Sequence, residues 1–167
     1  VLNAEHALGL VIGSMPPEQM GVAALRQVPP AALAVAAMAM RDKYGDARVA
    51  VLLEPLFLDP VGLDARHDDA FEVLMDVLLS LGQESRREIV AQRVSQSADK
   101  SLATSARCRR VSMMADRGEY VQAWTLFHET QRANPDDPQL LHLEMLTLLS
   151  EGREQEAVIR RAAQNGG

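Results

Sequence analysis

Apolar residues recur at helical spacing through the last third of the chain. Val111 and Met114 stand seven and four residues before Gly118. Met145 and Leu148 stand at the same two distances before the next glycine of the pattern, 34 residues further along. Residues three apart lie on one face of an α-helix, so each pair marks an apolar stripe. The pattern predicts two amphipathic helices that each end at a glycine.

The residues after each glycine predict a second helix. At Gly118 we expect a turn in the left-handed conformation, which glycine adopts without steric cost. The next helix is expected over residues 120–133 and should end before Pro135, because proline disfavours helical geometry in the residue that precedes it. Ala123 lies one turn into this helix, and Ala157 holds the equivalent position in the next copy. A small residue there lets the two helices of a hairpin cross closely.

Residues 104–163 resemble the tetratricopeptide repeat family, which is built from helical hairpins of about 34 residues. Three arginines, Arg107, Arg110 and Arg161, stand where that family usually has apolar residues. The resemblance implies that the hairpins stack, because one repeat cannot bury its apolar face alone, and that the stack holds another molecule. The matching residues are Met114, Gly118, Tyr120, Ala123, Phe127, Pro135, Leu141, Met145, Leu148, Gly152 and Ala157.

The same punctuation continues in weaker form toward the N-terminus. Gly82 lies 36 residues before Gly118, and Met75 stands seven residues before Gly82. Gly45 lies 37 residues before Gly82, and Met38 stands at the corresponding core offset. The sequence therefore predicts an all-α fold, an α-α superhelix of about five antiparallel helix pairs in a single domain over residues 1–167. The expected hairpins are residues 1–29, 30–60, 61–100, 101–137 and 138–167.

Composition and charge agree with a helical fold and narrow the function. The chain is 47% hydrophobic but only 4% aromatic, with eight Met, and it has a net charge of −6. This charge argues against nucleic acid as a partner, although residues 100–110 hold four basic side chains that form either a solvated face or a contact for an acidic ligand. The longest apolar tract, residues 30–40, is too short to span a membrane. The single Cys excludes an internal disulfide and makes the cytoplasm the default compartment. The chain begins at Val1, so a removed leader or a longer parent protein remains open.

Candidate chemistry is sparse. The sequence contains no phosphate-binding loop, dinucleotide fingerprint or paired metal-ligand motif, so we expect neither a cofactor nor an enzyme. His67, Asp68 and Asp69 could bind a metal, but we favour Asp68 or Asp69 as the cap of a helix that begins at Ala70. Cys108 and His142 are one repeat, 34 residues, apart, so their thiol and imidazole could face one groove and form a nucleophilic pair. We favour groove lining as the role of both.

The repeat offsets predict a concave groove lined by the first helices of the last two hairpins. Among these residues only Arg109 suits the clamp with which tetratricopeptide repeats capture a C-terminal carboxylate, so an amphipathic helix or an extended apolar segment of a partner is the expected ligand. The predicted groove residues are Ser105, Cys108, Arg109, Ser112, Asp116, Gln139, His142, Leu143, Leu146 and Leu149.

These features favour a non-enzymatic protein–protein interaction module that binds a partner peptide or helix. It would act as an adaptor or as a small acidic chaperone of the kind that some bacterial secretion systems use. The alternative is a helical regulatory or substrate-docking domain of a larger enzyme. Self-association into a homo-oligomer is also left open.

Overall fold

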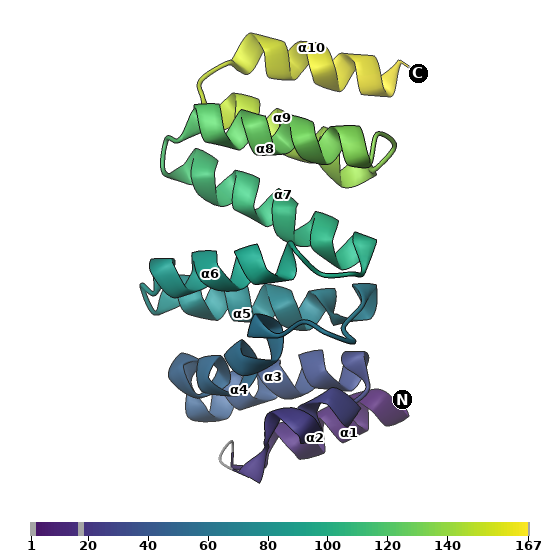
Figure 1. Cartoon of the computed structure of the whole chain (residues 1–167), viewed down its shortest axis with the longest axis vertical. Helices are drawn as coiled ribbons and strands as arrows, with labels where there is room; N and C mark the ends of the chain where they lie inside the picture. Colours follow the sequence, from purple (N-terminus) through teal and green to yellow (C-terminus); the bar gives the residue numbers. More distant parts are fainter. Residues whose placement is uncertain (1–2, 17–18, 167) are drawn as a thin grey trace. The chain divides into compact units, whose positions relative to one another are not determined.

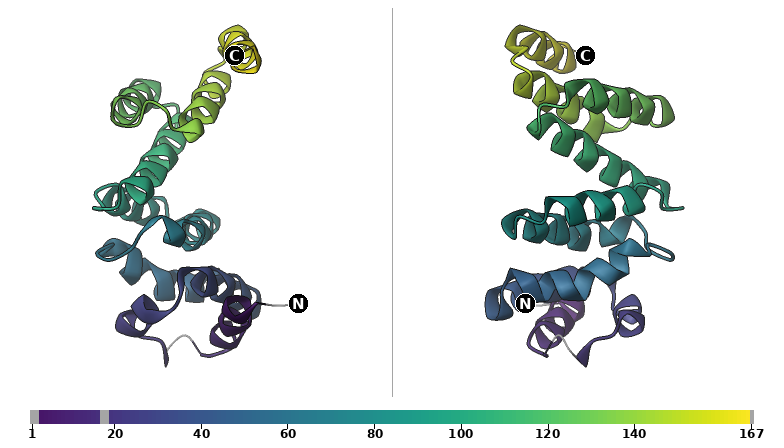
Figure 2. Two further views of the ribbon diagram at one scale, coloured as in Figure 1. Left: turned by 90° about the vertical axis from the view of Figure 1, so that its right-hand side faces the viewer. Right: turned by 60° about the vertical axis from the view of Figure 1, so that its left-hand side comes forward.

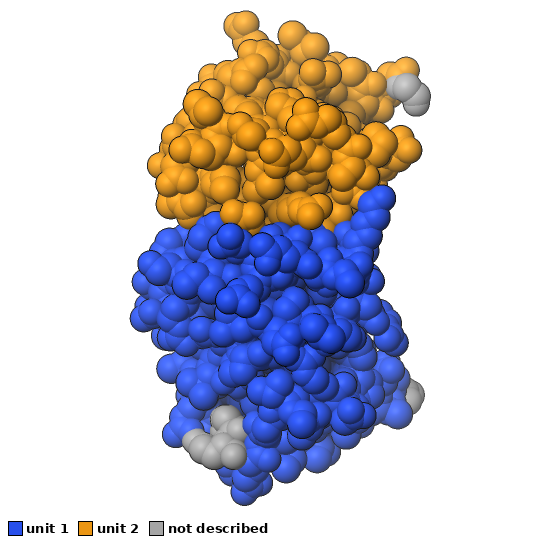
Figure 3. Space-filling model, in the orientation of Figure 1, with its two compact units in different colours: residues 1–103 blue, residues 104–167 orange. Residues whose placement is uncertain are grey.

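The computed structural model describes residues 3–16 and 19–166, and these residues form α-helices joined by turns, one short 3-10 helix and no strand (Figure 1). The prediction of an all-helical protein is therefore confirmed for the described part of the chain. No described helix has both the length and the hydropathy needed to cross a lipid bilayer. The chain divides into two compact units, residues 1–103 and residues 104–167 (Figure 3). The helices are α1 (Ala4–Gly13), α2 (Val22–Gln27), α3 (Pro30–Tyr44), α4 (Asp46–Leu58), η2 (Ala65–His67), α5 (Asp68–Ser80), α6 (Glu84–Val94), α7 (Lys100–Asp116), α8 (Tyr120–Ala133), α9 (Pro138–Ser150) and α10 (Glu154–Asn165).

Three hairpin turns share one backbone geometry. Gly82, Gly118 and Gly152 have positive φ angles of 67°, 76° and 80°. In each turn the amide of the residue after the glycine donates to the carbonyl four residues before the glycine, at 2.8 or 2.9 Å. This six-to-one bond satisfies a carbonyl that the end of the helix leaves without a partner, and it requires a residue in the left-handed region. The predicted glycine turns at these positions are confirmed.

Gly45 makes a different and tighter turn. Its φ is 88°, it is the only residue between α3 and α4, and its amide donates to the carbonyl of Arg41 at 2.9 Å. The Nε of Arg41 also donates to the Asp46 carboxylate at 2.7 Å, which fastens the two helix ends together. Because α3 continues up to the residue before Gly45, the core offsets of the other hairpins do not apply here. Met38, expected in the core, is 47% exposed.

In unit 1 the helices from α3 to α6 pack against their neighbours in the chain and against the next but one, while α1 packs against α3 and α2 against α4. Helix α3 contacts α1, α4 and α5, and α4 contacts α2, α5 and α6, as the views in Figure 2 show for the first four helices. Two glycines of α1 allow its close approach to α3, since a Cβ on Gly9 would lie 2.6 Å from the Ala32 carbonyl oxygen. Phe57 and Phe71, whose ring centroids lie 5.5 Å apart, join α4 to α5 in the core.

In unit 2 the second helix of the best-defined hairpin has the predicted bounds, Tyr120–Ala133. Ala123 has no exposed surface, as the predicted close crossing requires. The Tyr120 hydroxyl donates to the Ser150 carbonyl at 2.6 Å, and the indole of Trp124 donates to the Glu151 carboxylate at 2.8 Å. These two bonds tie α8 to the end of α9. The core cluster joins three helices through Cys108, Val111, Ala115, Ala123, Phe127, Leu140 and Leu143.

Candidate functional site

An open apolar groove lies between α9 and α10 in unit 2. Its volume is about 400 Å³. Seven residues line it: His142, Met145, Leu146 and Leu149 from α9, and Ala157, Val158 and Arg161 from α10.

Helix α9 contributes one complete face to the groove. Its four lining residues have the spacing i, i+3, i+4 and i+7, which places them along one side of a helix. Leu146 and Leu149 are 47% and 50% exposed. The other side of α9 is buried: Leu140 and Leu143 belong to the core cluster, and the Thr147 hydroxyl donates to a carbonyl of its own helix at 2.8 Å. The helix is thus anchored by one face while its second apolar face meets solvent.

Helix α10 closes the groove from the other side. Ala157 is 5% exposed and lets α10 approach α9, while Val158, the next residue, is 67% exposed at the edge of the groove. Arg160 holds the two helices together through an ion pair with Glu144 at 3.2 Å. Helix α9 is therefore fixed by its buried face, whereas α10 contacts α9 through Ala157 and this ion pair and is otherwise exposed.

The groove has a positive electrostatic character. Arg161 lines it and forms no ion pair with any residue that the structure describes. Of the described residues that line the groove, none is acidic. A carboxylate on a ligand would meet an available guanidinium here, and an apolar side chain would meet leucine and valine.

The structure brings together three of the ten residues predicted for the groove: His142, Leu146 and Leu149. Cys108 and Leu143, by contrast, lie in the core cluster, which corrects their assignment to an open surface. The reason is that these positions of α7 and α9 face α8, so the hairpin covers them. The other five do not line this groove: Ser105 is buried, Arg109 and Ser112 are half-buried, and Asp116 and Gln139 are exposed.

Sequence reasoning missed the contribution of α10. The repeat pattern assigned the groove to first helices alone, whereas the observed groove lies between the two helices of one hairpin. A signal was present, because Val158 and Arg161 are three residues apart and follow the small Ala157 on one helical face. The thiol and imidazole considered as a nucleophilic pair do not face one surface: Cys108 is buried in the core cluster, and His142 is exposed at the groove.

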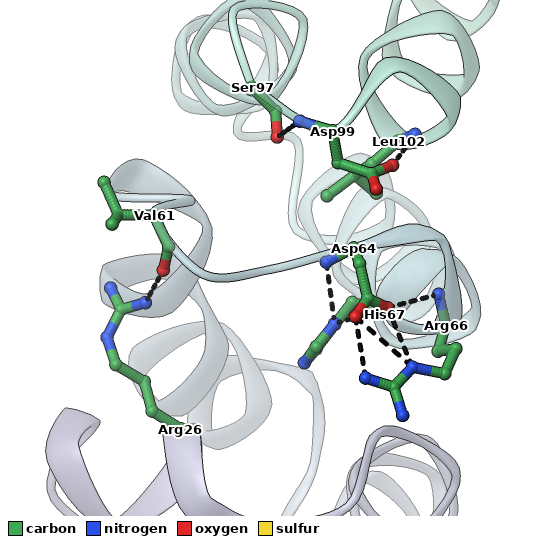
Figure 4. A network of polar contacts seen from close by, with 8 residues as sticks. All are labelled: Arg26, Val61, Asp64, Arg66, His67, Ser97, Asp99 and Leu102. Carbon is green, nitrogen blue, oxygen red and sulfur yellow. Dashed lines mark hydrogen bonds and ion pairs between the residues drawn. The ribbon is translucent and has the colours of Figure 1, made fainter.

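The segment around His67 forms the N-terminal cap of a short helix (Figure 4). The Asp64 carboxylate accepts from the Arg66 amide at 2.9 Å, and Nδ1 of His67 accepts from the Asp64 amide at 3.1 Å. Together the two side chains form a reciprocal capping box around η2, after which α5 begins at Asp68. The predicted helix start at Ala70 with Asp68 or Asp69 as its cap is therefore wrong.

The charges of this motif follow from its bonds. The Arg66 guanidinium, which donates to the Asp64 carboxylate, holds the pKa of that carboxyl well below its usual range. Burial lowers the pKa of the His67 imidazole, which is 6% exposed and in its neutral form accepts the amide bond. Within the described residues, no group of three or more His, Cys, Asp and Glu side chains is arranged to hold a metal ion.

The loop after α4 is held by hydrogen bonds from a side chain to its backbone carbonyls. Arg26 of α2 donates to the carbonyl oxygens of Asp59 and Val61, as Figure 4 shows for Val61. The same figure shows Asp99, whose carboxylate accepts from the Leu102 amide at 2.8 Å and so caps the first turn of α7. These polar groups stabilise the connections of unit 1, Arg26 from a distant helix and Asp99 within its own turn.

No family model matches this sequence, and neither the curated proteins nor the solved structures compared with it contain a match.

Proposed function

We propose that this protein is an interaction module that binds an amphipathic helix of a partner in the groove between α9 and α10. The observation that carries the proposal is the pairing of an apolar lining with Arg161, which forms no ion pair with any described residue, beside a helix, α9, whose opposite face is buried. An amphipathic helix fits such a groove through anchors at i, i+3, i+4 and i+7. Among the proposed roles are an adaptor and a small acidic chaperone that act in the cytoplasm.

We also propose that the helix pairs are repeats of the tetratricopeptide type that stack in a superhelix. The support is local: three hairpins turn at glycines 36 and 34 residues apart with the same φ region and the same six-to-one hydrogen bond. Ala123 and Ala157, five residues after two of these glycines, are both buried. A repeat built in this way exposes one face of a helix for recognition while the other faces pack.

The energetics favour apolar anchors over charge. Full burial of a leucine or valine side chain stabilises by roughly 1.5–3 kcal/mol, so covering the exposed half or two thirds of Leu146, Leu149 and Val158 contributes on the order of 3 kcal/mol before the costs of association. An exposed ion pair with Arg161 adds at most about 1 kcal/mol. The arginine therefore selects and orients a ligand whose affinity comes mainly from apolar contact.

Two labelled peptides test the proposal by fluorescence anisotropy. Both are designed helices with leucine at i, i+3, i+4 and i+7, and they differ only in having flanking glutamates or flanking lysines. We expect the glutamate peptide to bind more tightly, and we expect Arg161→Glu to reverse this preference. The reversal arises because the single charge that lines the groove changes sign.

Helix α10 offers a matched pair of variants for the same assay. Val158 and Ile159 are adjacent and equally exposed, at 67% and 66%, but only Val158 lines the groove. Val158→Asp should abolish binding of the glutamate peptide, whereas Ile159→Asp should leave it unchanged. If neither peptide binds, or if the two aspartate variants lose binding equally, the groove is not the binding site.

A further inference from the structure

A second apolar groove lies in unit 1, across α1, α3 and α5. Its volume is about 440 Å³. Leu10 and Met38 are the exposed apolar residues at its surface, at 41% and 47%. The lining residues are His6, Leu10, Ala34, Val35, Met38, Ala39, Asp42, Asp69 and Val73.

The charges of this second groove are opposite to those of the first. Asp42 on α3 and Asp69 on α5 line it, and both are exposed. Neither carboxylate forms an ion pair with any part of the chain that the structure describes. His6 also lines the groove, so its net charge is −2 when this imidazole is neutral. One chain thus carries an apolar surface with an available arginine and another with two available carboxylates.

We infer that the partner of the α9/α10 groove is a second copy of this chain, and that the helix it presents is α3, whose exposed Met38 and Asp42 lie one turn apart on the α1/α3/α5 surface. This inference rests on the proposed function, because it names the occupant of the same site. In the contact, Leu146 and Val158 of one copy pack against Met38 of the other, and Arg161 faces Asp42 and Asp69. Apolar contact supplies the affinity, and the charges set which faces meet.

The proposed contact joins two different surfaces, so it is heterologous. A dimer formed in this way keeps one unused groove of each kind, and further copies can add. We therefore expect the mass in sedimentation velocity to rise with concentration from the 18.3 kDa monomer through dimers to longer assemblies. A symmetric dimer through α9 and α10 alone would stop at two copies.

Charge reversal gives a direct test of which faces meet. Arg161→Glu alone, and the double variant Asp42→Lys with Asp69→Lys alone, should each form fewer of the species heavier than the monomer at a given concentration, because an attraction across the contact becomes a repulsion. An equimolar mixture of the two variants should recover them, because each groove of one variant then finds an opposite charge on the other. Circular dichroism of each variant establishes that its helices are retained, and Ile159→Asp serves as the variant that should still associate.

The outcomes separate this inference from the proposed function. If the parent stays monomeric up to its solubility limit, or if the lysine double variant associates like the parent, the second-copy inference is overturned. Binding of the glutamate peptide that depends on Val158 would then still support the proposed function with another partner. Self-association that survives Val158→Asp, together with no peptide binding, would overturn both.

Discussion

The turn at Gly118 allows a sharp test of why glycine is required there. Its φ is 76°, and a Cβ added to it would meet no atom within 4 Å. Substitution therefore costs backbone energy alone, without a steric clash. An L-residue in the left-handed helical region is destabilised by roughly 1–2 kcal/mol. Gly118→Ala should lower the free energy of unfolding by about this amount.

The order of a substitution series distinguishes the backbone cost from a steric cost. Asparagine is larger than alanine, but it tolerates the left-handed region better because its side chain bonds locally to the backbone. We therefore expect Gly118→Asn to be more stable than Gly118→Ala, and Gly118→Val to be the least stable. Gly82→Ala and Gly152→Ala should cost about as much as Gly118→Ala, since all three turns share the same geometry and open surroundings.

The measurement is urea denaturation followed by circular dichroism and by fluorescence. The chain has a single tryptophan, Trp124, which belongs to α8, the helix that follows this turn, and therefore reports on unit 2. In a chain of this length each kcal/mol also shifts the melting temperature by roughly 2–4 °C. The reasoning is refuted if the asparagine variant is less stable than the alanine variant, or if Gly118→Ala melts with the parent.

Three further predictions concern packing, pH and capping. Ala123→Glu places a carboxylate at a position without exposed surface and should cost roughly 3–5 kcal/mol in urea denaturation, through overpacking and an unpaired buried charge; a parent-like midpoint would show that this helix crossing is wrong. His67→Gln keeps an acceptor for the Asp64 amide and removes a titrating group whose pKa is lowered by burial in the folded protein, below the usual value of about 6.5 for an imidazole. The stability due to neutral His67 is complete above the unfolded pKa and is lost as pH falls through the folded pKa, so the parent should lose more stability than the variant on acidification below pH 6.5, and parallel profiles would contradict this. Tyr120→Phe removes the hydrogen bond to the Ser150 carbonyl and should lower the free energy of unfolding by about 0.5–1.5 kcal/mol. An unchanged urea midpoint would contradict this.

The sequence alone determined where several helices end and turn. Glycine at positions 82, 118 and 152 predicts a left-handed turn because the conformational preference resides in the residue itself. The bounds of α8 followed from a glycine before it and Pro135 after it. Where several residues compete for one role, local reasoning was weaker: Asp64, Asp68 and Asp69 all lie near the start of α5, and the capping side chain is that of Asp64, whose partner His67 the sequence also offers as a candidate metal ligand.

Only the tertiary structure decided which apolar faces are covered. Leu143 and Leu146 are one turn apart on α9 and equally hydrophobic, yet Leu143 is 5% exposed and Leu146 is 47% exposed. The difference depends on how the flanking helices α8 and α10 pack against α9, which brings Leu143 into one cluster with Phe127 and leaves Leu146 at the groove. Backbone preferences act over a few residues, whereas burial depends on the meeting of distant segments, so the groove required the packed helices to be seen.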